Sequence, residues 1–162
     1  MKIEIVPVNK ENLFGAVEVW NQVVEDGVAF PQEDLLDPAT GEAFFAEQTF
    51  TGVAVDADSG KVMGLYILHP NNIGRCGHIC NASYAVRRNS RGCGVGEMLV
   101  RHCIAKAGEC GFGILQFNAV VATNTAALRL YEKLGFTRLG VIPKGFRMND
   151  RYEDIVPHYI VL

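Results

Sequence analysis

A turn with three glycines in five residues lies in the middle of the chain, between a strand-like segment and a helix-like segment. It reads Gly92-Cys93-Gly94-Val95-Gly96 and follows Arg91. Glycine has no Cβ, so the backbone can adopt positive φ angles and come close to a ligand. The first N–H groups of a helix lack helical partners and, together with the helix dipole, favour an anion. This pattern predicts a strand–turn–helix unit that holds a pyrophosphate group.

Three other interpretations of the turn are less consistent with the residues around it. Glycine could serve only to make a tight turn, but Arg87, Arg88 and Arg91 add positive charge and favour the phosphate. A Walker loop is excluded because no Gly-Lys-Ser/Thr follows the glycines. A dinucleotide-binding Rossmann turn is disfavoured, because the spacing is Gly-x-Gly-x-Gly and the next strand ends in Val120-Val121 without a carboxylate for a ribose.

Hydrophobic periodicity around this turn predicts a mixed α/β fold in one domain, residues 1–162. Pro157 makes the last expected strand an edge strand or an interrupted one. The expected helices cover Glu11–Glu25, with Asn9 as the N-cap, Gly41–Gln48, Gly94–Gly111 and Asn124–Leu134. The expected strands cover Lys2–Val8, Thr51–Asp56, Lys61–Leu68, His78–Val86, Ile114–Val121, Phe136–Ile142 and Tyr152–Val161.

Charge is divided unevenly along the chain. Residues 1–60 contain twelve Asp/Glu and two Lys, whereas residues 61–162 contain thirteen Lys/Arg and six Asp/Glu. The basic part is consistent with an anionic ligand near the glycine turn. The whole chain has a net charge of −3 and lacks a dense basic run, which argues against nucleic-acid binding.

Other sequence features exclude several classes. No run of 18 apolar residues exists, so a membrane span is not expected, and the first residues do not resemble a signal peptide. The five cysteines are scattered, without a Cys-x-x-Cys pair, so a metal site is not expected. Free thiols without a targeting signal indicate a cytoplasmic protein.

A second motif begins the helix expected at Asn124–Leu134. Asn124 lies at its N-cap, and Tyr131 lies two turns later on nearly the same face, with the small Ala127 between them. Such a face leaves room for a narrow ligand with a polar group at each end. The alternative is an N-cap and a Tyr that packs at the edge of the helix.

Together the two motifs resemble the GCN5-related N-acetyltransferase (GNAT) superfamily. Its Gln/Arg-x-x-Gly-x-Gly/Ala pattern corresponds to Arg91-x-x-Gly94-x-Gly96, and its Asn-x-x-Ala-x-x-x-Tyr-x-x-x-Gly-Phe block begins at Asn124. The resemblance implies an acyl-CoA N-acyltransferase fold, in which helices flank a mostly antiparallel sheet with one splayed parallel pair. It also implies acetyl-CoA as co-substrate, no metal, and, as in many members, a homodimer.

The resemblance also assigns roles to residues. The turn binds the pyrophosphate through backbone N–H groups, the pantetheine arm extends along the preceding strand, and Tyr131 donates a proton to the leaving thiolate. The implied cofactor-binding residues are Tyr84, Ala85, Val86, Arg91, Gly92, Cys93, Gly94, Val95, Gly96, Asn124 and Tyr131.

The stretch from Asn71 to Ala82 and the segment from Ile142 to Asp154 suggest an acceptor class. The first resembles fungal acetyltransferases that act on proline analogues such as azetidine-2-carboxylate, and the second resembles the phosphinothricin acetyltransferase group. Carried over, Asn81 and Asn124 handle a small-molecule amine, an amino acid or a proline-like analogue. The alternatives are a protein N-terminal or lysine acetyltransferase and a non-catalytic CoA-binding module.

The acceptor's general base is not identified by the sequence. Asn81 and Ser83 share one face of their strand, so they either line the acceptor pocket and hold a water or bond to neighbouring backbone. No Glu lies on this strand. Glu33 and His158 are weak candidates, for which a solvated loop and a structural role are the alternatives.

Overall fold

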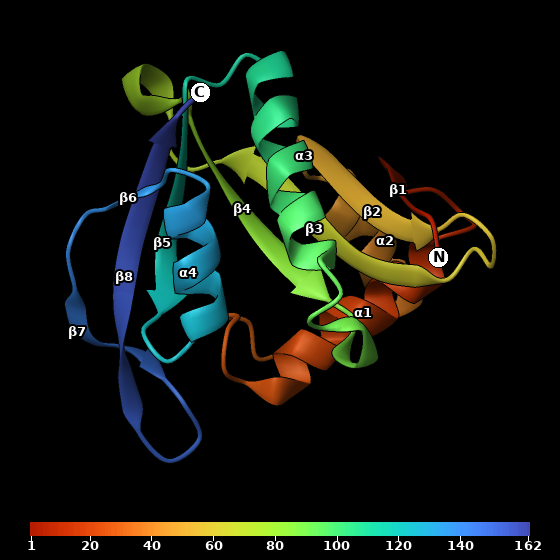
Figure 1. The fold of residues 1–162 in the computed structure, drawn as a ribbon, viewed down its shortest axis with the longest axis horizontal. Helices are drawn as coiled ribbons and strands as arrows, with labels where there is room; N and C mark the ends of the chain where they lie inside the picture. Colours follow the sequence, from red (N-terminus) through yellow and green to blue (C-terminus); the bar gives the residue numbers. More distant parts are fainter.

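An eight-stranded mixed sheet forms the centre of the computed structural model, which describes all residues, 1–162 (Figure 1). The sheet order is β1-β2-β3-β4-β5-β8-β6, and β7 also pairs with β8. The strands are β1 (Ile3–Pro7), β2 (Phe50–Asp56), β3 (Val62–Pro70), β4 (Ile79–Val86), β5 (Ile114–Val121), β6 (Thr137–Arg138), β7 (Ile142–Arg147) and β8 (Tyr152–Val161). The helices are α1 (Leu13–Asp26), α2 (Pro38–Ala46), α3 (Val95–Glu109) and α4 (Thr125–Lys133), with short 3-10 turns η1 (Gly74–Cys76) and η2 (Arg88–Ser90).

The helices cover both faces of the sheet. Trp20 of α1 packs against Phe30, Phe44 and Phe45 and forms one hydrophobic core with α2 and one face of β3. On the opposite face, α3 and α4 form the second core with β4 and β5. The residues of α3 spaced by four, Val95, Leu99, Cys103 and Ala107, are all buried, as their periodicity predicts.

Most element bounds agree with the sequence prediction within a few residues, and the exceptions have local causes. Helix α1 begins at Leu13 with Asn12 as its N-cap, so the predicted N-cap at Asn9 is wrong. The Asn9 carboxamide instead accepts the N–H groups of Glu11 and Asn12 in a turn before the helix. Helix α2 begins at Pro38, earlier than predicted, because Asp37 and Thr40 form a reciprocal capping box.

The C-terminal strands required a correction. The strand predicted over Phe136–Ile142 is only the two-residue β6, and the separate strand β7 was not predicted. Strand β8 lies inside the sheet, so the edge-strand alternative for Pro157 is wrong. The interrupted-strand alternative is confirmed: the pairing of β8 with β5 breaks between His158 and Val156, where Pro157 has no N–H to donate.

The only parallel pair in the sheet is β4 with β5, and it is short. The strands pair at Ile79–Ile114 and Cys80–Leu115, and then diverge towards their carboxyl ends (Figure 1). A mixed sheet with one splayed parallel pair is the arrangement that the resemblance implies, so this fold expectation is confirmed. The splay leaves the second half of β4 without a neighbour on the β5 side.

Three further observations concern membrane-spanning helices, clusters of metal ligands and disulfides. None of the helices is both long and apolar enough to span a bilayer. No three His, Cys, Asp or Glu side chains converge as metal ligands would. The cysteines are all unpaired: Cys80 and Cys103 are buried, and the other three are exposed.

Candidate active site

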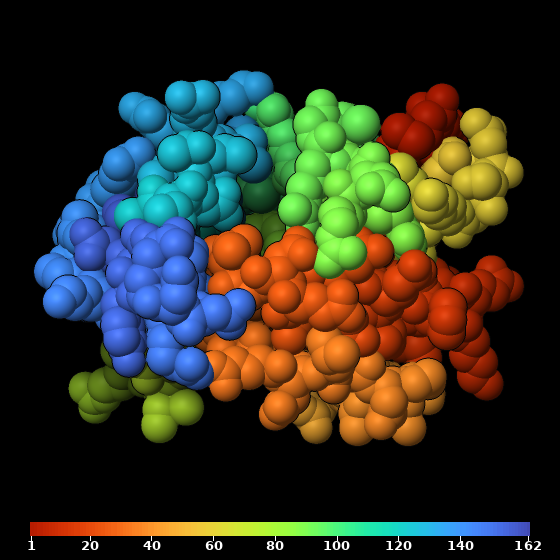
Figure 2. Space-filling model, turned by 90° about the horizontal axis from the view of Figure 1, so that it is seen from below, coloured from red at the N-terminus to blue at the C-terminus, as the bar shows by residue number.

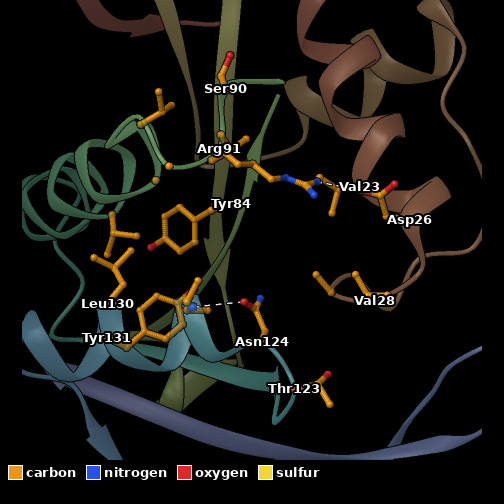
Figure 3. Close-up of a pocket in the computed structure, with 18 residues that line it drawn as sticks. Val23, Asp26, Val28, Tyr84, Ser90, Arg91, Thr123, Asn124, Leu130 and Tyr131 are labelled. Atoms are coloured by element: carbon orange, nitrogen blue, oxygen red, sulfur yellow. Dashed lines mark hydrogen bonds and ion pairs between the residues drawn. The ribbon is translucent and has the colours of Figure 1, made fainter. Parts of the chain in front are cut away.

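A cavity of about 440 Å³ opens beside the splay, between the turn that precedes α3 and the first half of α4 (Figure 3). On the surface it is the hollow between α4 (cyan) and the turn (green), with the α1–α2 segment (orange) below it (Figure 2). Of the predicted cofactor residues, it is lined by Tyr84, Val86, Arg91, Gly92, Val95, Gly96, Asn124 and Tyr131. The two predicted motifs therefore form opposite walls of one cavity.

The glycine turn has the backbone geometry that anion binding requires. Gly92 and Gly94 have φ angles of 80° and 81°, a region that favours glycine, and Gly94 is the N-cap of α3. The first helical hydrogen bond runs from Met98 N–H to Gly94 O, so the N–H groups before Met98 have no helical partner. Cys93 and Gly94 are exposed and do not line the cavity.

The open edge of β4 refines the expected pantetheine contacts. Arg87 N–H bonds to Met63 O on β3, and successive peptide groups point in alternate directions, so the backbone of Ala85 also faces β3. The peptide groups of Tyr84 and Val86 face the splay. The Ala85 side chain is 1% exposed within the α1 core, and Ala85 does not line the cavity.

The arginines near the turn are ion-paired, which changes the interpretation of the charge pattern. Arg87 is buried and pairs with Glu18 at 3.2 Å, while Arg88 and Arg91 donate to the two carboxylate oxygens of Asp26 at 2.7 and 2.9 Å. The acidic N-terminal part thus neutralises the basic part directly through α1. In this structure, the positive charge that the sequence places at the turn is largely compensated.

A second, smaller cavity of about 210 Å³ lies between the diverging ends of β4 and β5. It shares Tyr84, Asn124 and Tyr131 with the first cavity, so the two meet at these residues. Its polar lining consists of hydroxyl and carboxamide groups, including Asn81, Ser83 and Asn118, and it contains no charged side chain. The Asn81/Ser83 face of β4 therefore borders this cavity.

Asn81 lines the smaller cavity and also bonds to neighbouring backbone. Its Oδ1 accepts the N–H of Ala82 at 2.8 Å, beside the point where β4 leaves β5. Asn124 acts in the same way as the N-cap of α4, where its Oδ1 accepts the Ala127 N–H at 3.2 Å. In both residues the oxygen is used locally, which leaves the amide N–H groups as donors at the cavity walls.

Tyr131 lies at the junction of the two cavities. Its hydroxyl makes no hydrogen bond with the protein, and its ring packs against Phe117 and Phe136. Burial, assisted by the nearby Cys103, raises the pKa of Tyr131, so the phenol keeps its proton at neutral pH. The Tyr84 hydroxyl, by contrast, is enclosed in the core without a partner.

The two weak candidates for a base lie outside the second cavity. Glu33 forms an ion pair with Arg147 over a separate hollow between the α1–α2 loop and β7. His158 is 1% exposed, and its ring packs against Tyr131. Burial lowers the pKa of His158, and its Nδ1 bonds to Val156 O at 2.7 Å, so the ring is neutral and structural.

Asn118 and Asp26 are site residues that the sequence analysis missed. Asn118 lies in the β5 bulge opposite Pro157 and exchanges hydrogen bonds of 2.7 and 3.2 Å with Asn71. Pro157 is the only sequence signal for that bulge, and it lies 39 positions away. Asp26 is the last residue of α1, and its contact with Arg91 has no local sequence signal.

Comparisons with known proteins agree with this geometry. The sequence model of the acetyltransferase (GNAT) family matches residues 18–136. N-acetyltransferase aca1 of Schizosaccharomyces pombe is 31% identical, over 94% of this chain and 80% of its own length. The structure of a GCN5-related N-acetyltransferase from Kribbella flavida superposes with a TM-score of 0.89 at 30% identity, covering 99% of this chain and 98% of its own.

A more distant neighbour carries the cofactor. The phosphinothricin acetyltransferase of Sinorhizobium meliloti, solved in complex with acetyl-CoA, has a TM-score of 0.90 at 20% identity and covers 100% of this chain and 89% of its own. This likeness shows the shared fold. Together with the family match over residues 18–136, the comparisons show that the chain belongs to the GNAT family of acetyl-CoA-dependent N-acetyltransferases.

Proposed function

We propose that the chain transfers the acetyl group of acetyl-CoA to the amine of a small molecule, an amino acid or a proline-like analogue. The observation that carries this proposal is the meeting of two cavities at Asn124 and Tyr131, with the glycine turn at the far end of the larger one. The smaller cavity has about 210 Å³ and no charged lining, which suits a compact acceptor presenting a neutral amine.

The larger cavity is the proposed acetyl-CoA site, and the proposed reaction uses no metal. In the proposed complex the N–H groups at the start of α3 bind the pyrophosphate, and the peptide groups of Tyr84 and Val86 pair with the pantetheine amides. The open edge of β4 supports this arrangement, because the splay leaves those peptide groups without a strand partner. Arg91, Gly92, Cys93, Gly94, Val95 and Gly96 form the proposed turn contacts, of which Cys93 and Gly94 contribute only through the backbone conformation.

In the proposed reaction the neutral amine nitrogen attacks the thioester carbonyl carbon. The carbon–sulfur bond then breaks, the sulfur leaves with the electron pair, and Tyr131 supplies its proton to that sulfur. The amine proton passes to water in the second cavity, since no carboxylate or accessible imidazole lines it, and solvent water returns a proton to the Tyr131 phenolate. Asn81 and Asn124 orient the acceptor through their free amide N–H groups.

The test is release of free CoA, detected by a thiol reagent, with a panel of free amino acids, cyclic imino acids and N-terminal and lysine peptides. We expect release with particular free amino or imino acids only. Release with peptides alone supports a protein acetyltransferase and contradicts the small-molecule assignment. Binding of acetyl-CoA without release for any amine supports a non-catalytic CoA-binding module.

A further inference from the structure

The wall of the larger cavity contains a carboxylate where an anionic cofactor group is proposed to bind. Asp26, the last residue of α1, lines this cavity together with Arg91 and Gly92 of the turn (Figure 3). A negative charge beside a pyrophosphate is unfavourable. Its presence therefore needs an explanation other than cofactor attraction.

The ion pairs of Asp26 with two arginines explain why a carboxylate lies in this wall. Its Oδ2 accepts from Arg91 at 2.9 Å and its Oδ1 accepts from Arg88 at 2.7 Å, so one carboxylate bridges both arginines. About half of the Arg91 side chain is exposed to solvent (49%), compared with 23% of Asp26. The carboxylate is thus held in place, whereas the guanidinium is free to change partner.

Helix α1 holds Asp26 firmly at this point. Gln22, one turn earlier, accepts the Arg88 N–H through its Oε1 at 2.9 Å, and Glu18 pairs with the buried Arg87. Gly27, with a φ of 64°, then ends the helix. Arg87 and Arg88 are fixed to α1 by several contacts, and Arg91 is attached to it by Asp26 alone.

We infer that Asp26 is a placeholder anion: it holds the Arg91 guanidinium in the free enzyme, and the cofactor pyrophosphate displaces it when acetyl-CoA binds. Asp26 acts through Arg91 and is therefore a positioning residue. The exchange replaces one anion by another, so the guanidinium is never left without a counter-charge. When the product CoA leaves, Asp26 recovers Arg91, which favours release. This inference rests on the pyrophosphate position in the proposed function.

The decisive variant is Asp26→Asn, which keeps the shape and removes the competing charge. We expect CoA to bind roughly three- to tenfold more tightly, the effect of one charge removed beside an anion at a partly exposed site. S-acetylpantetheine, which lacks the pyrophosphate, should bind as it does to the wild type. The KM for acetyl-CoA should fall with the Kd for CoA, and calorimetry measures both Kd values.

Glu25→Gln is the matched control, since Glu25 is the neighbouring acid and lies 3.6 Å from Arg88 but does not line the larger cavity. We expect less than a twofold change in CoA affinity from it. Unchanged or weaker CoA binding by Asp26→Asn would overturn the inference. Equal tightening for CoA and S-acetylpantetheine would also overturn it, because it would reveal a general change of the cavity.

The wild-type protein provides a readout that does not depend on the stability of the variant. The guanidinium NMR signal of Arg91 should shift on addition of CoA and stay in place with S-acetylpantetheine. The Arg91 signal could stay in place although CoA binds more tightly than S-acetylpantetheine. That result would contradict the exchange of Asp26 for pyrophosphate at Arg91, but it would leave the proposed cofactor site intact. If the wild type binds both equally, the pyrophosphate cradle fails as well.

Discussion

The two cavities that meet at Tyr131 are built in different ways. Two walls of the larger one are local motifs, the glycine turn before α3 and the start of α4, whose backbone conformations are set by residues next to one another, and the end of α1 with its loop completes the lining. The smaller one is made by segments far apart in the chain, the loop after α1, the end of β4 and the β5 bulge. The proposed cofactor site thus depends mainly on local motifs, whereas the proposed acceptor site is assembled from segments distant in the sequence.

The difference shows how such an enzyme can keep one cofactor and change its acceptor. In the proposed complex Gly92, Gly94 and Gly96 contribute through the backbone, so we expect their substitution to affect any reaction that uses the cofactor. Asn81 and Asn118 act through side chains on separate strands, and each can be exchanged without altering the turn. Substitutions on either side of Tyr131 should therefore have separable effects on the two substrates.

The largest effect should come from Gly96→Glu on the cofactor side. The added carboxylate would enter the cavity beside the proposed pyrophosphate, and we expect more than a 100-fold loss of acetyl-CoA affinity, which is about 2.8 kcal/mol or more. A Cβ at Gly96 meets only Val86 Cγ2, at 3.7 Å, so the fold should tolerate the side chain. Calorimetry with acetyl-CoA measures the loss.

Gly108→Glu is the control on the same helix. A Cβ there has no neighbour within 4 Å, and the position is exposed and outside both cavities. Its acetyl-CoA affinity should equal that of the wild type. If the Gly96→Glu protein bound acetyl-CoA as tightly as the wild type, the glycine turn would not be part of the cofactor site.

Tyr131→Phe tests the residue at which the two sides meet. Loss of the proton donor should lower kcat by about 100-fold, the lower end of the range for general acid catalysis. The Kd for acetyl-CoA should change little, because only the hydroxyl is removed. Stopped assays of CoA release and calorimetry separate these quantities. Tyr152→Phe, at an exposed site on β8, is the control. If Tyr131→Phe had the kcat of the wild type, Tyr131 would be excluded as the general acid.

Asn81→Ala tests the acceptor side and should have the smallest effect. The change removes one hydrogen bond to the Ala82 N–H and one donor at the smaller cavity, and we expect the KM for the acceptor to rise roughly tenfold. The KM for acetyl-CoA should stay the same. Initial rates with each substrate varied in turn measure both constants. Asn72→Ala, in the exposed loop after β3, serves as the control. Parallel increases in both constants would contradict the separation of the two sites.

The sequence predicted the features that depend on neighbouring residues, and it did not predict those that depend on distant ones. The turn at Arg91–Gly96 and the Asn124–Tyr131 helix were recognisable because the conformation of each depends on nearby residues. The register of strand β4 was predicted well enough to place Asn81 and Ser83 on one face. These features form two walls of the larger cavity and one wall of the smaller.

The remaining features depend on contacts between distant residues. The charge pattern indicated an anionic ligand near the glycine turn, but Arg88 and Arg91 pair with Asp26, more than sixty positions away, and the sequence pattern does not reveal this charge compensation. Asn118 reaches the acceptor cavity because Pro157 disturbs the strand pairing opposite it. Strand β7 is largely exposed and lacks the apolar alternation that predicts a strand.

The unpaired half of β4 has a consequence for the amount of folded enzyme in a cell. A bare strand edge is open to pairing with other chains, and in the proposed complex the pantetheine arm covers it. Because such a ligand binds only the folded chain, a free concentration of 100 times the Kd adds about 2.7 kcal/mol to the free energy of unfolding. The lifetime of the protein would then follow the supply of acetyl-CoA, so that a starved cell would lose the catalyst together with its acetyl donor.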